Sequence, residues 1–164
     1  MKKSFLICIM CIISVLPVCA LDVGDDAGSF VNPDLSGNFI FSKDYIGSKW
    51  VLIDFFATWC KPCKEELPKL EEIYADFGEK GLAALLFSID EEGEKAVKPF
   101  FAESPTEMTV LIDRYMVTAE RYGVEGIPVV LLINPSGKIV VRGDGYSEET
   151  IEKIRTILTE NLGT

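Results

Sequence analysis

Two cysteines, Cys60 and Cys63, are the residues of this sequence whose type and spacing point most directly to chemistry. A Cys-x-x-Cys pair can cycle between dithiol and disulfide, bind a metal or carry a haem. A structural zinc site needs four ligands, but the chain has no histidine and its three other cysteines lie within the leader described below. A closed metal site would need a second chain or unusual carboxylate ligands, so we expect neither a metal nor another cofactor.

The residues beside the pair disfavour two further uses. Covalent haem attachment calls for a histidine directly after the second cysteine, where this chain has Lys64. Peroxidase chemistry of the peroxiredoxin kind calls for a threonine or serine three residues before the reactive cysteine, whereas Thr58 lies two residues before Cys60. Reversible thiol–disulfide exchange is the use that fits best.

The pair is predicted to lie where a strand ends and a helix begins. Residues 51–56 are apolar apart from Asp54, which is typical of a buried strand. Pro62 suits a first helical turn, and apolar residues recur beyond it at helical spacing, namely Leu67, Leu70, Ile73, Tyr74 and Phe77. A helix N-terminus favours thiolate over thiol. We therefore expect Cys60, at the tip, to be the more exposed, attacking thiol, and Cys63, one turn further in, to be the resolving thiol.

The pattern Phe-x-Ala-Thr-Trp-Cys-x-Pro-Cys-x-x-Glu-x-Pro over residues 55–68 resembles the thioredoxin superfamily. More narrowly, it resembles the exported, TlpA-like (ResA-like) branch, which contains disulfide reductants of the bacterial cell envelope. The resemblance extends from about Ala27 to the C-terminus. It implies an α/β thioredoxin fold: a mixed central sheet flanked by helices, with an N-terminal hairpin and a helical insertion after the second core strand.

Two acids near the pair are candidate supporting residues. The apolar neighbours of Asp54 favour a buried carboxyl that accepts and returns the proton of Cys63, and a solvated strand acid is the alternative. Asp54 resembles thioredoxin itself, since many TlpA-like proteins have an uncharged residue there. Glu66 matches a glutamate found near the disulfide in the TlpA-like branch, and a surface acid on the helix is an equally simple interpretation.

Other candidates shape the surface around the sulfurs. Trp59 is expected to cover the sulfurs while remaining partly exposed. Lys61 would help to hold a thiolate at Cys60, or it is an ordinary solvated lysine. Ile127-Pro128 matches the position where thioredoxin-like proteins place a cis proline opposite the pair. This resemblance implies that the Ile127 backbone faces outward and can pair with an extended substrate.

The remaining elements follow from turns and apolar runs. Residues 34–38 form a turn between two short extended pieces, and residues 82–90 form the second core strand. Residues 91–104 are predicted to form the inserted helix, with a break or kink at Pro99. Further along, we expect strands at residues 108–112, 129–133 and 138–142, a short helix at residues 114–122, and a final helix capped at residues 147–150.

The N-terminal residues 1–20 are predicted to be a signal peptide or membrane anchor. They carry two lysines, a long apolar run and a small residue, Ala20, that suits signal peptidase. Cleavage, lipidation at Cys19 and retention as an anchor all remain open. Each outcome places the thioredoxin-like domain, residues 21–164, outside the cytoplasm, in the periplasm or at the outer face of the cytoplasmic membrane.

Composition limits the partners. The chain has 164 residues, is 48% hydrophobic and carries a formal net charge of −10, as expected for one globular domain with an acidic surface. Such a surface disfavours nucleic acid and anionic lipid, so membrane contact is expected through the N-terminal segment alone. Since Cys60 and Cys63 are the two cysteines outside the leader, a structural disulfide framework is not expected.

The predicted function is thiol–disulfide exchange with other proteins outside the cytoplasm. The resemblance favours a reductant that acts on protein disulfides, including apocytochrome c during cytochrome c maturation, and that is recharged by a membrane thiol carrier. An oxidant or isomerase of secreted proteins is one alternative, because direction depends on a reduction potential that the sequence does not reveal. A binding module that uses the same groove without redox turnover is another.

Overall fold

The computed structural model describes residues 20–163, so residues 1–19 of the predicted leader lie outside the described residues. None of the helices within this range has the length and apolar character needed to cross a lipid bilayer.

A five-stranded sheet in the order β5-β4-β3-β6-β7 forms the centre of the domain. The strands are β3 (Trp50–Phe56), β4 (Leu82–Ser88), β5 (Thr109–Ile112), β6 (Val129–Ile133) and β7 (Ile139–Asp144). The strands β3, β4 and β5 run parallel to one another, whereas β6 is antiparallel to both β3 and β7. The predicted mixed sheet is therefore confirmed, with β3 at its centre.

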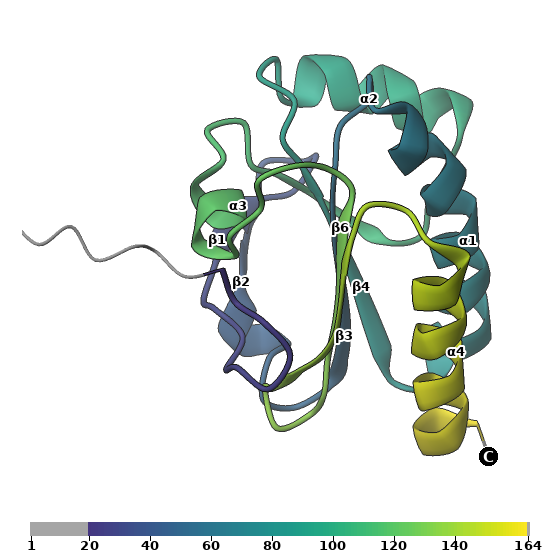
Figure 1. Ribbon diagram of the computed structural model, residues 1–164. Coiled ribbons are helices and arrows are strands. Elements are labelled where there is room, and N and C mark those ends of the chain that lie inside the picture. Colours follow the sequence, from purple (N-terminus) through teal and green to yellow (C-terminus); the bar gives the residue numbers. More distant parts are fainter. Residues whose placement is uncertain (1–19, 164) are drawn as a thin grey trace, which may run out of the picture.

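Helices and a small hairpin cover the two faces of this sheet (Figure 1). The helices α1 (Lys61–Phe77) and α4 (Glu148–Leu162) lie side by side on one face. The short helix α3 (Val117–Arg121) and the antiparallel pair β1 (Val31–Pro33) and β2 (Phe39–Phe41) lie on the other. The predicted N-terminal hairpin is thus confirmed. Two single-turn 3-10 helices, η1 (Ser42–Asp44) and η2 (Gly78–Lys80), complete the regular structure.

Alternation along β3 divides the core into two layers, because successive side chains of a strand point to opposite faces. Leu52 and Phe56 pack in the layer beneath α1 and α4, whereas Ile53 and Phe55 pack in the layer beneath α3 and the hairpin. Asp54 lies two residues from both Leu52 and Phe56, so its side chain points to the same face of the sheet as theirs. Its carboxyl group therefore enters the core on the α1 side.

The predicted inserted helix is present as α2 (Glu94–Glu103), but Pro99 does not break it. A proline within a helix removes one backbone hydrogen bond. Packing offsets this loss, because Val97 is fully buried and the rings of Phe100 and Phe101 pack against Phe56 of the core, the first tilted and the second edge-on. Of the predicted break or kink, the break is therefore wrong, and the kink stays a prediction.

One predicted helix boundary and one predicted helix cap also differ from the structure. The helix expected from residue 114 begins at Val117, after Met116 in a left-handed conformation (φ 56°), and the carboxylate of Asp113 accepts the N–H groups of Thr118 and Ala119. The final helix begins after Ser147 as expected, but the Ser147 hydroxyl makes no capping hydrogen bond.

Candidate redox site

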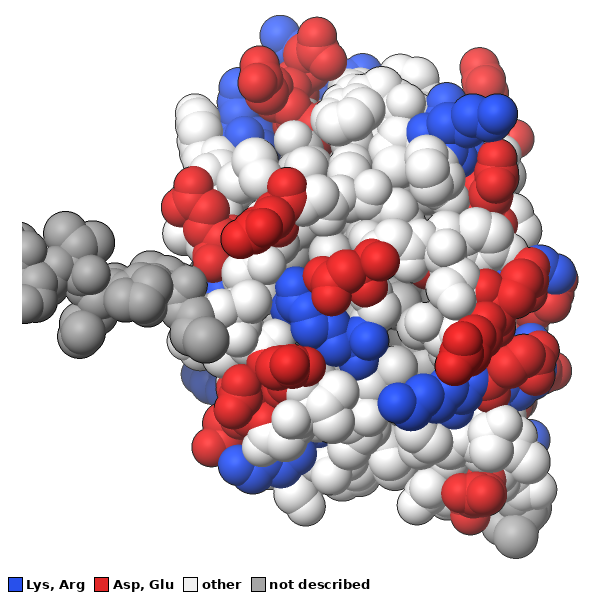
Figure 2. Space-filling model, viewed as in Figure 1, with Lys and Arg blue, Asp and Glu red and all other residues white. Residues whose placement is uncertain are grey.

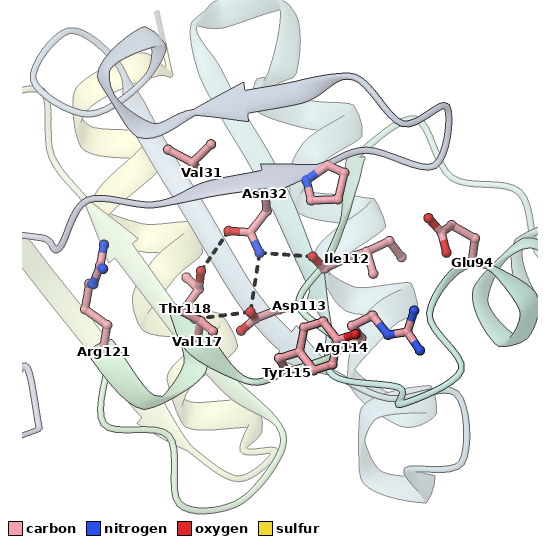
Figure 3. Close-up of a pocket in the computed structure, with 11 residues that line it drawn as sticks. Val31, Asn32, Glu94, Ile112, Asp113, Arg114, Tyr115, Val117, Thr118 and Arg121 are labelled. Carbon is pink, nitrogen blue, oxygen red and sulfur yellow. Dashed lines mark hydrogen bonds between the residues drawn. The ribbon is translucent and has the colours of Figure 1, made fainter.

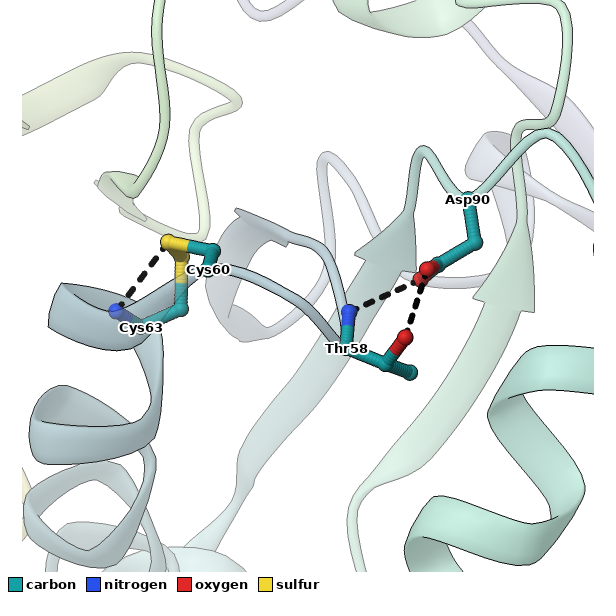
Figure 4. Close-up of a disulfide and its surroundings, with 4 residues drawn as sticks. All are labelled: Thr58, Cys60, Cys63 and Asp90. Carbon is teal, nitrogen blue, oxygen red and sulfur yellow. Dashed lines mark hydrogen bonds between the residues drawn. A yellow bond between two sulfur atoms is a disulfide. The ribbon is translucent and has the colours of Figure 1, made fainter.

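Cys60 and Cys63 form a disulfide at the start of α1, with an S–S distance of 2.02 Å (Figure 4). Cys60 is the N-cap residue of α1, and its sulfur accepts a hydrogen bond from the backbone N–H of Cys63 at 3.2 Å. Cys60 is 4% exposed and Cys63 is fully buried. A negative charge on the Cys60 sulfur would therefore be stabilised both by the N–H group of Cys63, which donates to it, and by the helix dipole.

The surface beside the disulfide is formed by two loops. Trp59 is 67% exposed, and the neighbouring Lys61 and Pro62 are also exposed. The Ile127-Pro128 peptide bond is cis, as expected, and Pro128 is buried while Ile127 is half-buried. Trp59 and Ile127 line the same groove, so the fold brings the cysteine loop and the proline loop together.

The peptide groups of Ile127 are free for a partner. Within residues 20–163 neither its N–H nor its C=O has a hydrogen-bond partner, whereas the C=O of Pro128 accepts the N–H of Gly145 at 2.8 Å. An extended segment of another chain could therefore pair with Ile127 beside the disulfide.

Asp54 and Glu66 are both fully buried, Asp54 on β3 and Glu66 one turn beyond Cys63 on α1. The surface alternatives for these two acids are therefore wrong. Helix periodicity explains the position of Glu66, because it lies one turn beyond Cys63 and one turn before Leu70, both of which are buried. None of the four carboxylate oxygens accepts a hydrogen bond from another group among the described residues. If one of the two acids is protonated, its O–H group can donate a hydrogen bond to the carboxylate of the other.

Burial sets the electrostatics of this carboxyl pair. Desolvation raises the pKa of Asp54 well above its usual range, and the negative charge and hydrogen bonding of Glu66 raise it further. Burial also raises the pKa of Glu66 to about 7, while its interaction with Asp54 opposes the rise. Two carboxylates in one buried site cannot readily both be charged, so the pair holds a proton close to neutral pH.

Asp90 is a buried residue at the site that the sequence analysis missed. Its carboxylate accepts the backbone N–H of Thr58 at 2.9 Å and the Thr58 hydroxyl at 2.6 Å (Figure 4), as well as the Ser88 hydroxyl at 2.8 Å. Thr58 lies two residues before Cys60. Asp90 therefore holds the loop after β3 against the end of β4. The parallel pairing of these strands was a usable signal, since their carboxyl ends must meet at one edge of the sheet.

Arg142 was also missed. From β7 it donates to the backbone C=O groups of Leu21, Tyr122 and Gly123 at 2.9, 2.8 and 3.1 Å, and it is paired with Asp144 at 2.8 Å. These bonds fix the start of the loop that leads to Ile127 and Pro128. The sequence contains no signal for this contact, because every residue offers a backbone C=O group.

A separate cavity of about 390 Å³ lies between the N-terminal hairpin and the end of β5 (Figure 3). At its base the Asn32 side chain donates to the C=O of Ile112 at 3.0 Å and accepts the Thr118 hydroxyl at 2.7 Å. Burial raises the pKa of Asp113, and the N–H groups of α3 oppose that rise. These polar groups bind one another, so they fasten the hairpin to the sheet. Throughout residues 20–163, no three Cys, Asp or Glu side chains come together in a group that could hold a metal ion.

Comparisons with known proteins agree with this geometry. Residues 23–142 match the model of the AhpC/TSA family. The chain is 34% identical over 139 residues to the thiol-disulfide oxidoreductase ResA of Bacillus thuringiensis. The alignment covers 84% of this chain and 79% of that protein. It is 32% identical over 132 residues to ResA of Bacillus subtilis, covering 80% of this chain and 73% of that protein.

Solved structures give the same result. A Chlorobium tepidum protein assigned as the thiol:disulfide interchange protein DsbE superposes with a TM-score of 0.79 at 31% identity, covering 88% of this chain and all of the other. The thioredoxin domain of a Bacteroides vulgatus thiol-disulfide oxidoreductase superposes with a TM-score of 0.74 at 27% identity, covering 84% and 99%. The chain therefore belongs to the AhpC/TSA family of the thioredoxin superfamily, within its ResA-like branch of thiol–disulfide oxidoreductases.

Proposed function

We propose that this protein reduces disulfide bonds of other proteins outside the cytoplasm, with Cys60 as the attacking thiol and Cys63 as the resolving thiol. The observation that carries the assignment is the position of the Cys60 sulfur, which caps α1, accepts the N–H of Cys63 and is the more exposed of the two. The thiolate is the reactive form of a cysteine, and this environment favours it at Cys60.

The exchange proceeds in two steps. The Cys60 thiolate attacks one sulfur of the partner's disulfide, and the other partner sulfur leaves as a thiolate that takes up a proton. Cys63 then loses its proton and attacks the Cys60 sulfur. This second attack closes the Cys60–Cys63 disulfide and releases the second partner sulfur, which is also protonated. Two electrons pass from the protein to its partner.

The buried carboxyl pair is proposed to handle the proton of Cys63. Cys63 is fully buried, so its thiol cannot lose a proton directly to bulk water. Asp54 lies on the neighbouring strand and Glu66 one turn along α1, and their pKa values are both raised by burial. A carboxylate of this pair can accept the proton when Cys63 attacks and return it when the disulfide is reduced again.

The N-terminal sequence and the family branch support the proposed cellular setting. The leader favours a location in the periplasm or at the outer face of the cytoplasmic membrane. The TlpA-like resemblance favours a reducing direction, apocytochrome c among the substrates, and a membrane thiol carrier as the electron donor. Lys61, Trp59 and Pro62 would contact these partners, because all three are exposed beside the sulfurs.

Covalent trapping tests the assigned roles. With Cys63→Ser, the mixed disulfide on Cys60 cannot be resolved, so we expect covalent adducts with partner proteins that disappear on treatment with a reductant. Mass spectrometry of the adducts identifies the partners. Cys60→Ser and the double serine variant are the matched controls, and we expect both to yield no adducts. Adducts forming on Cys63 in the Cys60→Ser variant instead would reverse the roles. Full cellular activity of the double variant would mean that the protein acts as a binding module.

A further inference from the structure

The groove beside the disulfide is large enough to hold part of a partner chain. Its volume is about 810 Å³, and Trp59 and Ile127 connect it to the redox site. The rest of its lining comes from helix α3 and from the loops that follow β4, precede α3 and precede β6. A partner whose disulfide reaches Cys60 must place its neighbouring residues in or next to this groove.

The groove is strongly acidic. Four exposed glutamates line it, together with a single cation, Arg114, whose guanidinium lies 5.1 Å from the ring centre of Tyr115. Across residues 20–163 none of these four glutamates takes part in an ion pair. They are Glu91, Glu92, Glu120 and Glu125.

The general acidity of the protein does not account for this concentration. On the face shown in Figure 2, acidic and basic side chains are interspersed. The cavity of about 370 Å³ between α1 and α2 is balanced, with Lys64 and Glu71 in its lining. On the α1 side of the cysteines the exposed charged side chains of the first helical turns are Lys61, Lys64 and Glu65, which sum to a net positive charge. The two sides of the disulfide therefore differ in charge, and the groove is the negative side.

The groove also offers apolar contacts. Trp59 and Tyr115 are 67% and 76% exposed, whereas Val124 is buried, and Ile89 and Met116 are half-buried. Exposed aromatic side chains beside partly buried aliphatic ones are typical of sites that anchor a partner side chain. The free peptide groups of Ile127 add main-chain pairing for an extended segment.

We propose that this groove selects partners in which an extended, positively charged segment flanks the disulfide cysteine, with an aliphatic or aromatic residue packed against Trp59 and Tyr115. The proposal rests on the proposed function, because it assigns a substrate class to the same site. Unpaired carboxylates at a groove attract cations and accelerate their encounter with the site, and salt screens this effect.

Peptide reduction kinetics test the proposal. Three peptides of equal length carry the same intramolecular disulfide and differ in three flanking positions, which are all Lys, all Ser or all Glu. We expect the reduced protein to react about tenfold faster with the Lys peptide than with the Glu peptide at low ionic strength, and the ratio to fall towards one at high ionic strength. The uncharged hydroxyethyl disulfide reports redox activity without the groove.

Charge-matched variants assign the effect to the groove. The groove variant is Glu91→Gln, Glu92→Gln, Glu120→Gln and Glu125→Gln, and we expect it to lose the Lys preference while still reducing hydroxyethyl disulfide at the original rate. The control removes four exposed acids elsewhere and should keep the preference: Glu103→Gln, Glu107→Gln, Glu152→Gln and Glu160→Gln.

The outcomes separate the two proposals. Equal rates for all three peptides, or a preference that survives in the groove variant, would overturn the proposed selectivity while leaving the redox function intact. Failure to reduce even hydroxyethyl disulfide would instead overturn the proposed function. In that case the affinities of the protein for Lys and Glu peptides without a disulfide still decide whether the groove prefers positively charged segments. Binding is followed by the fluorescence of Trp59, and the Trp59→Phe variant gives the background signal.

Discussion

Asp54 and Glu66 bring two carboxyl groups into a core that offers them no other hydrogen-bond donor among the described residues. A buried carboxylate without donors is costly, and two together cost more, so the folded protein retains protons that the unfolded chain releases. The pair thus stores a proton in the same core layer that contains Cys63. Its position links the chemistry of the sulfurs to the pH of the surroundings.

This linkage predicts how stability depends on pH. The pKa of Glu66 rises from 4.5 to about 7 on folding, so the folded state binds more protons than the unfolded state between these values. The contribution of Glu66 to stability is therefore fully present below about pH 4.5 and is lost as the pH rises through about 7, a loss of up to about 3 kcal/mol. Urea denaturation of the oxidised protein at several pH values measures this fall.

Neighbouring variants provide the control for this experiment. Glu66→Gln should remove the part of the fall that comes from Glu66 and leave the part that comes from Asp54, whose pKa burial alone also raises. Glu65→Gln should keep the whole fall, because Glu65 is exposed on the same turn of α1. An unchanged pH dependence in Glu66→Gln would mean that Glu66 is ionised in the folded protein.

At this scale the sequence was informative about the cysteines and less so about the acids. The spacing and neighbours of Cys60 and Cys63 sufficed to place them at a helix start. Glu66 remained ambiguous because a glutamate is usually exposed. Its spacing from Cys63 and Leu70, which places it on the buried face of α1, would have resolved the ambiguity.

At the scale of elements, the site depends on loops that meet at one edge of the sheet. The carboxyl ends of β3 and β4 lie together, which allows Asp90 to hold Thr58 in place. On the other side, Arg142 binds the loop that precedes Ile127. Together these contacts keep the cysteine loop and the proline loop on either side of one groove.

Removal of the Asp90 carboxylate should therefore affect both stability and reactivity. Asp90→Ala leaves the buried Ser88 hydroxyl and the Thr58 N–H without their acceptor, so we expect a loss of about 2 kcal/mol and slower attack by Cys60. Urea denaturation and the rate of disulfide reduction measure the two effects. Asp76→Ala is the control, because Asp76 is exposed, and its loss should cost less than about 1 kcal/mol. Equal behaviour of the two variants would show that Asp90 does not hold the loop.

The elements themselves were largely predictable. Apolar runs and turn residues located the five core strands and the hairpin to within a few residues. A break at Pro99 was expected because its local penalty was considered without the packing of Phe100 and Phe101 on Phe56. Arg142 could not have been found, since contacts between a side chain and distant backbone groups depend on the completed fold.

At the scale of the whole molecule, the direction of electron flow depends on the difference in free energy between the dithiol and disulfide forms of the domain. Three contributions enter this free-energy difference. They are the stabilisation of the Cys60 thiolate by the start of α1, the protonation of the carboxyl pair, and the contacts that change when the disulfide opens. A reductant is a protein whose disulfide form is the relatively stable one, whereas a strong oxidant stabilises its reduced form.

The most direct measurement is an equilibrium redox titration of the Cys60–Cys63 pair in thiol–disulfide buffers, with the two forms separated by thiol alkylation and quantified by mass spectrometry. We predict one reversible two-electron transition, with a midpoint closer to about −270 mV than to about −120 mV, the values of a reductant and an oxidant on this fold. A midpoint near the oxidising value would contradict the reducing direction. The absence of any reversible transition would contradict the redox function itself.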